Sequence, residues 1–309
     1  MKSKVLVLVG PTAVGKTALS IELAKRFDGE IISGDSMQVY RGMDIGTAKI
    51  TPEEQSGIPH HLIDIIDPDT PFSVQEYQRL AREKIAEVHG RGRYPMLVGG
   101  TGLYIESVIH DYDMPHVKEN QELRQELSRL AAERGNEVLH ARLREVDPET
   151  AEKLHPNDTR RMIRALEVYH VTGTPFSRLK GKGTSPYEAC WIGLTMPREQ
   201  LYDRINKRVD LMLEQGLVEE VKRLKEKGYH LGLTSMQAIG YKEIMSYLSG
   251  NLTLEEAVYL IKQGSRKYAK RQLSWFRRIK EMHWFDVTNR ECFAEIQQLV
   301  AGKCHLARE

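Results

Sequence analysis

A glycine-rich segment near the N-terminus places the strongest constraint on what this 309-residue chain can fold into. The segment follows the pattern G-x-x-x-x-G-K-[ST] and consists of Gly10, Pro11, Thr12, Ala13, Val14, Gly15, Lys16 and Thr17. An apolar run over residues 5–9 precedes it, and a helical pattern over residues 18–27 follows it. Because this pattern binds phosphate where it joins a strand to the N-terminus of a helix, its context predicts a strand, a phosphate-binding loop and a helix in succession.

The residue types in this loop suit an anionic ligand. Glycines allow successive backbone N–H groups to curl around phosphate oxygens, and the helix dipole favours negative charge at the same place. Lys16 would neutralise phosphate charge, and the Thr17 hydroxyl could hold Mg²⁺. The alternative, a glycine turn with an exposed lysine, is disfavoured by the flanking strand and helix. The loop alone does not distinguish a nucleoside triphosphate from another diphosphate ester.

Further apolar runs without alternation occur at residues 31–32, 96–98 and 191–194, and residues 283–287 predict a last strand. Such runs are typical of parallel strands that helices cover on both faces. Helical patterns lie at residues 73–89, where Ser73 and Glu76 form a capping box, and at residues 198–227 and 254–279. Alternating strands and helices predict an α/β fold with a P-loop NTPase-like parallel sheet.

The pattern changes between residues 117 and 172, where strand-like runs are absent. Leu123, Leu127 and Leu130 recur at helical spacing until Gly135, and further helices are expected to start at Asn136, at residues 147–148 and at residues 158–159. The glycine- and lysine-rich residues 180–186 indicate a flexible return. We therefore expect a core formed by residues 1–114 and 189–309, interrupted by an all-helical insertion domain over residues 115–188.

The composition says more about the cellular compartment of the protein than about its binding partners. The 45 Lys and Arg nearly balance the 43 Asp and Glu, so net charge decides little. Cys190, Cys292 and Cys304 are odd in number and include no C-x-x-C pair, which argues against a disulfide framework and a zinc ribbon and for a reducing compartment. No apolar run approaches the roughly eighteen residues that a membrane helix needs. We expect a cytoplasmic monomer that does not contact membranes.

Asp35 directly follows the predicted strand that ends at residue 34. It therefore stands at the carboxyl end of a parallel strand, the edge at which open α/β sheets bind ligands. A carboxylate there could bind Mg²⁺ through water, act as a general base, or cap a following helix, a role for which Ser36 competes. The residues alone leave these three roles open.

Two other short segments carry possible chemistry. Gly99, Gly100, Thr101 and Gly102 follow another predicted strand, and their glycines allow either close approach of a ligand to the backbone or a tight strand-to-helix turn. The pair 60–61, two histidines, has no third metal ligand at useful spacing and is interpreted as a turn.

Two tracts are rich in basic residues. Arg160, Arg161 and Arg164 project near one face of a short predicted helix. Residues 262–280 contain eight Lys or Arg and no acid, with Trp275 and Phe276 interleaved. A run of charge is usually a solvated helix face. A basic run of this length that includes aromatic residues favours an anionic polymer as partner.

In their order along the chain, these segments resemble the tRNA dimethylallyltransferase family, also called tRNA isopentenyltransferases. The matching segments are GPTAVGKT at 10–17, DSMQVY at 35–40, GTAK at 46–49, HHLID at 60–64, GGTGLY at 99–104, RRMIRALE at 160–167, GY at 240–241 and KRQLSW at 270–275. The match runs from residue 9 to about residue 284 and is of the bacterial type, since Cys292 and Cys304 lack the spacing of the zinc finger in eukaryotic members.

The resemblance implies transfer of a dimethylallyl group from dimethylallyl diphosphate to N6 of the adenosine 3′ of the anticodon of tRNA, with Mg²⁺ and release of diphosphate. It implies that Asp35 is the general base and that Thr12 and Arg208 also belong to the catalytic group. Arg208 would bind diphosphate together with the phosphate loop. A helical insertion would hold the anticodon stem-loop. The residues expected to contact tRNA are Asp35, Ser36, Met37, Gln38, Thr101, Arg160, Arg161, Met162, Ile163, Arg164, Lys270 and Arg271.

Three other functions account for parts of the sequence. A small-molecule kinase would share the phosphate loop, the sheet and Mg²⁺, but it leaves the basic tracts unexplained. An adenylate isopentenyltransferase would share the donor, yet it needs neither the insertion nor the tract at 262–280. A non-enzymatic RNA-binding protein would have no use for Lys16, Thr17 and Asp35 at one edge of a sheet.

Overall fold

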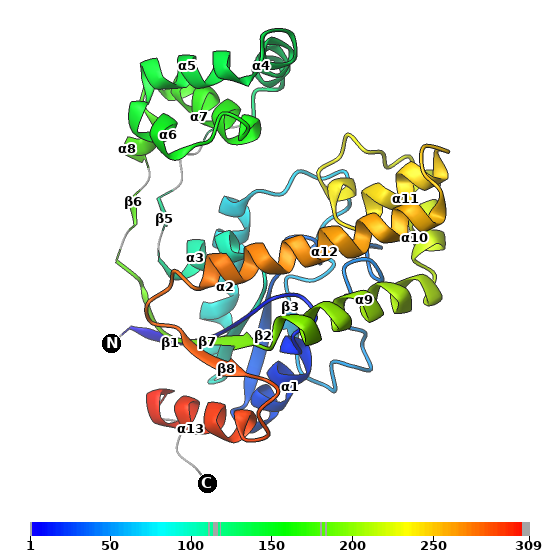
Figure 1. The fold of residues 1–309 in the computed structure, drawn as a ribbon. Helices are drawn as coiled ribbons and strands as arrows, with labels where there is room; N and C mark the ends of the chain where they lie inside the picture. The colour runs from blue at the N-terminus through cyan, green and yellow to red at the C-terminus, as the bar shows by residue number, and fades with distance from the viewer. Residues whose placement is uncertain are drawn as a thin grey trace. The chain divides into compact units, whose positions relative to one another are not determined.

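The computed structural model describes residues 2–110, 112–113, 117, 119–179, 181–182 and 184–304, and its chain divides into two compact units (Figure 1). The first unit comprises Met1–Ile109 and Ser185–Glu309, and the second comprises His110–Thr184. The sequence pattern predicts the insertion at 115–188, a few residues further along the chain. Among the described residues, no helix combines the length and the apolar character that crossing a membrane requires.

The first unit is built on a six-stranded sheet in the order β3-β2-β4-β1-β7-β8, and every paired neighbour is parallel. The strands are β1 Ser3–Val9, β2 Gly29–Gly34, β3 His60–His61, β4 Tyr94–Gly99, β7 Tyr187–Thr195 and β8 His283–Asp286. This confirms the expected α/β fold with a parallel sheet.

Strand β1 shows why the apolar runs lack alternation. Leu6 and Leu8 belong to one hydrophobic cluster, and Val5, Val7 and Val9 belong to another on the opposite face. Successive side chains of a strand point to opposite faces, so a strand buried on both sides needs an apolar residue at every position. Helices cover both faces of the sheet (Figure 1).

The helices of the first unit are α1 Lys16–Arg26, α2 Val74–Gly90, α3 Gly102–Ile109, α9 Arg198–Glu214, α10 Leu217–Glu226, α11 Tyr241–Leu248, α12 Leu254–Phe276 and α13 Cys292–Cys304. Ser73 caps α2 as expected, its side chain accepting from the backbone N–H of Glu76. The pattern at 198–227 forms two helices rather than one, because Gly216 takes a left-handed conformation with φ 97° between α9 and α10. Helices α10, α11 and α12 share a third hydrophobic cluster with Val39, Tyr40 and Met43 of the loop after β2.

The second unit contains α4 Gln121–Arg134, α5 Asn136–Val146, α6 Pro148–Lys153, α7 Thr159–Thr172 and α8 Phe176–Leu179. Helices α5, α6 and α7 start where the sequence predicted, and Leu127, Leu139, Leu143 and Met162 form the core of the unit. The unit is not entirely helical, since β5 Tyr112–Asp113 pairs antiparallel with β6 Gly181–Lys182. Part of the segment expected as a flexible return is therefore a strand, while Lys180 and Gly183 lie outside the described residues.

The histidine pair is a short edge strand and not the turn that sequence analysis expected. His60 and His61 pair with Ile31 and Ile32 of β2. The His61 Nε2 atom lies 2.6 Å from Oε2 of Glu30, a buried carboxylate that Arg91 also binds with both Nε and Nη2. Pairing with a neighbouring strand outweighed the local turn propensity, so these histidines stabilise the edge of the sheet.

Candidate active site

Three chain segments meet at the carboxyl edge of the sheet. Strands β2, β4 and β1 are neighbours, and Gly99 is in register with both Val9 and Gly34. Gly10, Asp35 and Gly100 therefore leave the sheet at the same level. A Cβ on Gly99 would overlap the backbone of Gly34, so this close approach of β2 to β4 requires glycine.

The phosphate loop has the geometry that its pattern predicts. Ala13 and Gly15 take positive φ values of 64° and 107°, and Gly15 is the N-cap residue of α1. The Lys16 Nζ atom donates to the carbonyls of Gly10 at 3.0 Å and Pro11 at 2.8 Å. The Lys16 ammonium therefore lies against the loop, where phosphate oxygens can replace the two carbonyls as its hydrogen-bond acceptors.

Positive charge is crowded at this edge. The pKa of Lys16 is lowered from 10.5 to about 7, chiefly by burial and then by the neighbouring Arg208 guanidinium, against an opposing effect of Asp35. Burial also lowers the pKa of Arg208. Arg208 comes from α9, and its Nη1 donates to the Thr12 hydroxyl at 3.3 Å. Two cations that lack full hydration form a site that an anion would stabilise.

Asp35 does not cap a helix, which corrects one of its three possible roles. Its Oδ1 accepts from the backbone N–H of Met37 at 2.8 Å and of Gln38 at 3.4 Å, and the chain that follows is a turn. This is the geometry by which an aspartate fixes its own loop. The Ser36 N–H donates to the Thr101 hydroxyl at 3.2 Å, so the segments after β2 and β4 are joined beside Asp35.

Two residues of α12 complete the site, and sequence analysis assigned neither of them a role. The Gln272 side chain is 4% exposed; its Oε1 accepts from Thr12 N at 2.8 Å, and its Nε2 donates to Gly100 O at 3.0 Å. Tyr268 lies beside Thr101 and Gln272, and its pKa is raised to about 12 by burial and then by Asp35. The sequence did contain a signal for Gln272, because this glutamine lies on the buried stripe of α12 between Ala269 and Phe276. A buried polar side chain needs hydrogen-bond partners, which indicates a role in the site.

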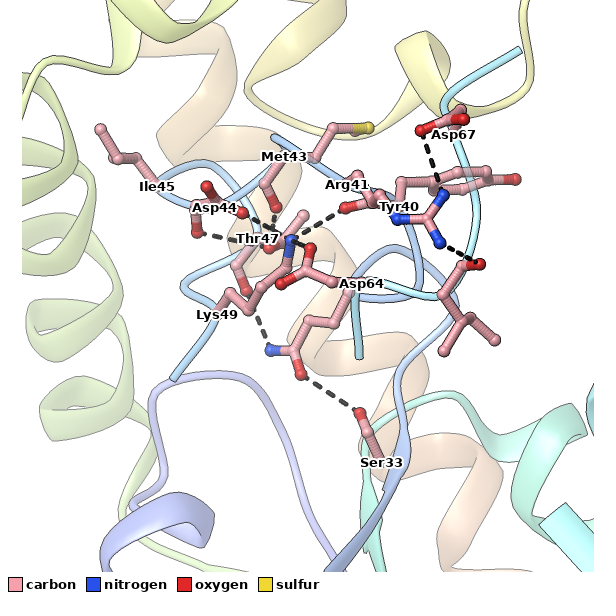
Figure 2. Close-up of polar contacts among 12 residues, drawn as sticks. Ser33, Tyr40, Arg41, Met43, Asp44, Ile45, Thr47, Lys49, Asp64 and Asp67 are labelled. Carbon is pink, nitrogen blue, oxygen red and sulfur yellow. Dashed lines mark hydrogen bonds and ion pairs between the residues drawn. The ribbon is translucent and has the colours of Figure 1, made fainter. Parts of the chain in front are cut away.

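The loop after Asp35 is held by a buried lysine (Figure 2). The Lys49 side chain is 4% exposed, and its Nζ donates to Tyr40 O at 2.8 Å and to the carboxylates of Asp44 and Asp64. The Gln38 Nε2 atom donates to Thr47 O at 3.3 Å and to Ala48 O at 3.4 Å. Residues 35–49, hereafter the Asp35 loop, therefore form a fixed structure without helix or strand.

The basic tract of α12 divides into two parts. Lys262 pairs with Asp210 at 2.6 Å, and Arg266 donates to Asn206 at 2.6 Å, so this part of α12 is bound to α9. Lys270 and Arg271 are exposed. The other exposed cations of the tract are Lys267, Arg277, Arg278 and Lys280.

The arginine motif of the second unit also divides. Arg160 and Arg161 are exposed, whereas Met162 and Ile163 are buried in the core of that unit. Arg164 donates to Glu167, which is 0% exposed, and to the carbonyl of Val117. Met162 and Ile163 lie on the apolar stripe that helix α7 buries, and their contact with tRNA stays a prediction.

Thr17, the residue expected to hold a metal, is exposed at the second position of α1. Among the described residues, no three His, Cys, Asp or Glu side chains come together as a metal site. Mg²⁺ commonly binds proteins through one or two oxygen ligands while substrate phosphates and water supply the rest. The Thr17 hydroxyl beside the phosphate loop fits a Mg²⁺ of that kind.

Binding of inorganic diphosphate should be coupled to proton uptake by Lys16. Bound phosphate raises the pKa of the ammonium from about 7, so binding above that pH takes up a proton, and affinity falls as pH rises further. Calorimetry in buffers of different ionisation enthalpy measures the uptake. In the Lys16→Met variant only diphosphate itself can change its protonation on binding, so this variant should take up fewer protons than the parent protein. Equal proton uptake by the two proteins would contradict the assignment to Lys16.

Comparisons with known proteins agree with this geometry. The family described as IPP transferase matches residues 38–279, and the family described as isopentenyl transferase matches residues 3–65. The tRNA dimethylallyltransferase of Geobacillus thermodenitrificans is 53% identical over 99% of both chains, and that of Geobacillus kaustophilus is 54% identical over 99% of both.

Two solved structures are also similar. The full-length tRNA isopentenylpyrophosphate transferase from Bacillus halodurans has a TM-score of 0.75 and 52% identity, over 98% of this chain and 97% of that one. A eukaryotic dimethylallyltransferase, described as acting on tRNA, has a TM-score of 0.81 and 31% identity, over 98% of this chain and 79% of that one. With its phosphate loop, parallel sheet and full-length relatives, the chain belongs to the tRNA dimethylallyltransferase family.

Proposed function

We propose that this protein transfers a dimethylallyl group from dimethylallyl diphosphate to N6 of the adenosine 3′ of the anticodon in tRNA. The observation that carries the proposal is the placement of one carboxylate, Asp35, at the same sheet edge as two partly buried cations, Lys16 and Arg208. A diphosphate donor needs the cations, and an amine acceptor needs the carboxylate. The relatives named as tRNA dimethylallyltransferases support this pairing of substrates.

The donor would bind through its diphosphate. In the transfer, the C–O bond to the allylic carbon breaks and its electron pair leaves with diphosphate. Negative charge then grows on the departing oxygen, where Lys16, Arg208 and the loop N–H groups would stabilise it. Thr12 holds Arg208 through its hydroxyl and Gln272 through its backbone N–H. The Thr17 hydroxyl would hold Mg²⁺, which supplies further positive charge to the diphosphate when bound.

The acceptor would be activated by Asp35. An adenine amine is a weak nucleophile because its lone pair is delocalised into the ring. As its nitrogen bonds to the allylic carbon, one N6 proton passes to the carboxylate of Asp35. The Met37 and Gln38 N–H groups orient that carboxylate through Oδ1. A base stacked in an anticodon loop must be flipped out to reach this position.

Exposed cations supply the surfaces for the RNA backbone. We propose that Lys270 and Arg271 of α12 and, in the second unit, Arg160 and Arg161 contact phosphates. Arg164 would act within the second unit by holding Glu167. Hydrogen bonds join Met37 and Gln38 to Asp35 and Ser36 to Thr101, and these four residues would contact the adenosine.

Asp35→Asn keeps the shape of the side chain but removes its capacity to accept a proton. The chemical step should fall by about 10²- to 10⁴-fold, the usual effect of losing a general base, while both substrates still bind. Single-turnover transfer with both substrates saturating, repeated across a Mg²⁺ series, measures this. A rate restored to that of the parent at high Mg²⁺ would instead assign Asp35 to metal binding.

The pair Lys270→Ala with Arg271→Ala should weaken tRNA binding and flatten its dependence on salt. Each lost phosphate contact lowers the slope of log affinity against log salt by about 0.7 to 0.9. The matched control is Lys25→Ala with Arg26→Ala, exposed residues at the C-terminal end of α1, the end remote from the phosphate loop. Equal slopes for the two variants would show that this face of α12 is only solvated.

A further inference from the structure

A buried carboxylate holds the Asp35 loop from a distant part of the chain. Glu220 lies on α10 and is 3% exposed. Its Oε2 accepts from the backbone N–H of Asp44 at 3.1 Å and of Ile45 at 2.8 Å. Its Oε1 accepts from the N–H of Gly46 at 3.2 Å and from the Tyr241 hydroxyl at 2.6 Å. Both oxygens are therefore engaged by the loop and by α11.

These four donors are neutral groups, so backbone and hydroxyl dipoles stabilise the Glu220 charge. Hydrogen bonds to a charged acceptor are about twice as strong as neutral ones. A buried carboxylate that loses its donors pays a large desolvation cost. Any movement of residues 44–46 away from α10 would incur this cost, so the carboxylate restricts the loop to one position.

Tyr241 fixes the same segment by contact. Its side chain is fully buried, and a Cβ on Gly46 would overlap the Tyr241 ring. Glycine at position 46 therefore lets the backbone lie against the aromatic ring. The two segments GTAK at 46–49 and GY at 240–241, far apart in the sequence, meet at this contact.

The restraint reaches Asp35 through the loop itself. The carbonyls of Thr47 and Ala48, directly after Gly46, accept from the Gln38 side chain. The backbone N–H of Gln38 donates to Asp35 Oδ1. Lys49 ties Tyr40 to Asp44 of the same loop and to Asp64, which lies further along the chain (Figure 2). The hydrogen bonds recorded for Glu220 go to this loop and to Tyr241, and none of them goes to the phosphate loop.

We propose that Glu220, acting with Tyr241, is a positioning residue for the acceptor. It sets the Asp35 loop, and with it Asp35 and Gln38, at the place where the adenine amine meets the donor. This rests on the proposed function of Asp35. The role separates the two substrates, because Glu220 binds the Asp35 loop, whereas Gln272 and Arg208 bind the phosphate loop.

The test compares Glu220→Gln and Tyr241→Phe with the parent protein. Glu220→Gln replaces one acceptor oxygen with an NH₂ group that faces N–H donors, so kcat/KM for tRNA should fall by about 10- to 100-fold, as for a small misplacement of a catalytic group. Tyr241→Phe keeps the ring against Gly46 and removes one donor of four, so a smaller fall is expected. The Kd for dimethylallyl diphosphate, measured by calorimetry, should stay within about twofold.

Glu243→Gln is the matched control. Glu243 is also buried, and its Oε2 accepts from the N–H of Gly240 at 2.8 Å at the start of α11; among the described residues its hydrogen bond and ion pair go to Gly240 and Lys242 and not to the Asp35 loop. It should lower the melting temperature and leave kcat/KM for tRNA near the parent value. Hydrogen exchange gives a readout without activity: the amides of Asp44, Ile45 and Gly46 should exchange faster in Glu220→Gln and not in Glu243→Gln.

Two results would overturn the positioning role. One is a Glu220→Gln protein that loses stability like the control yet transfers to tRNA at the parent rate. The other is unchanged exchange of the amides at 44–46, which would show that Glu220 does not restrain the loop. Failure of the proposed function is distinct, because the parent itself would then transfer nothing to tRNA while the exchange difference persisted.

Discussion

The parallel pairing of β1, β4 and β2 is the constraint on which the site depends. It places the ends of three strands at one level. The phosphate loop, Asp35 and the glycine segment at 99–102 therefore meet in space although they are far apart in the sequence. The contact of Gly34 with Gly99 shows how close this approach is. Helices from the C-terminal half then complete the site, with Arg208 from α9 and Gln272 from α12.

The electrostatics of the site favour binding over stability. Burial lowers the pKa of both Lys16 and Arg208, and the neighbouring Arg208 guanidinium lowers the pKa of Lys16 further. A protein optimised for stability alone would separate them, since like charges in a poorly hydrated place are unfavourable. The arrangement is understandable when a diphosphate fills the loop, because the ligand then provides the charge that the protein lacks.

Local pattern was sufficient for the long elements of the fold. The strands β1, β4 and β7, the helix α2 with its Ser73 cap and the phosphate loop all follow from apolar spacing and turn residues close in sequence. The two-residue strands β3, β5 and β6 did not, because two residues are too few to show a period.

Contacts between distant residues lay beyond the sequence pattern. Thr12 and Gln272 are separated by 260 positions and Glu220 and Gly46 by 174, so their hydrogen bonds become visible only in three dimensions. The pairing of charged side chains also becomes visible only in three dimensions. Arg164 and Lys262 belong to basic tracts in the sequence, yet each is paired with a carboxylate of its own unit. Composition identifies a basic helix, but only the fold shows which of its cations reach solvent.

The central claim is that tRNA, and not a free nucleotide, accepts the dimethylallyl group. Labelled dimethylallyl diphosphate and Mg²⁺ are incubated with the protein and with unmodified tRNA, AMP or ATP, and the labelled product is measured. The exposed cations of α12 and of the second unit predict that tRNA takes the label and that the free nucleotides do not. Labelled AMP or ATP with unlabelled tRNA would contradict the account and assign the chain to the nucleotide prenyltransferases.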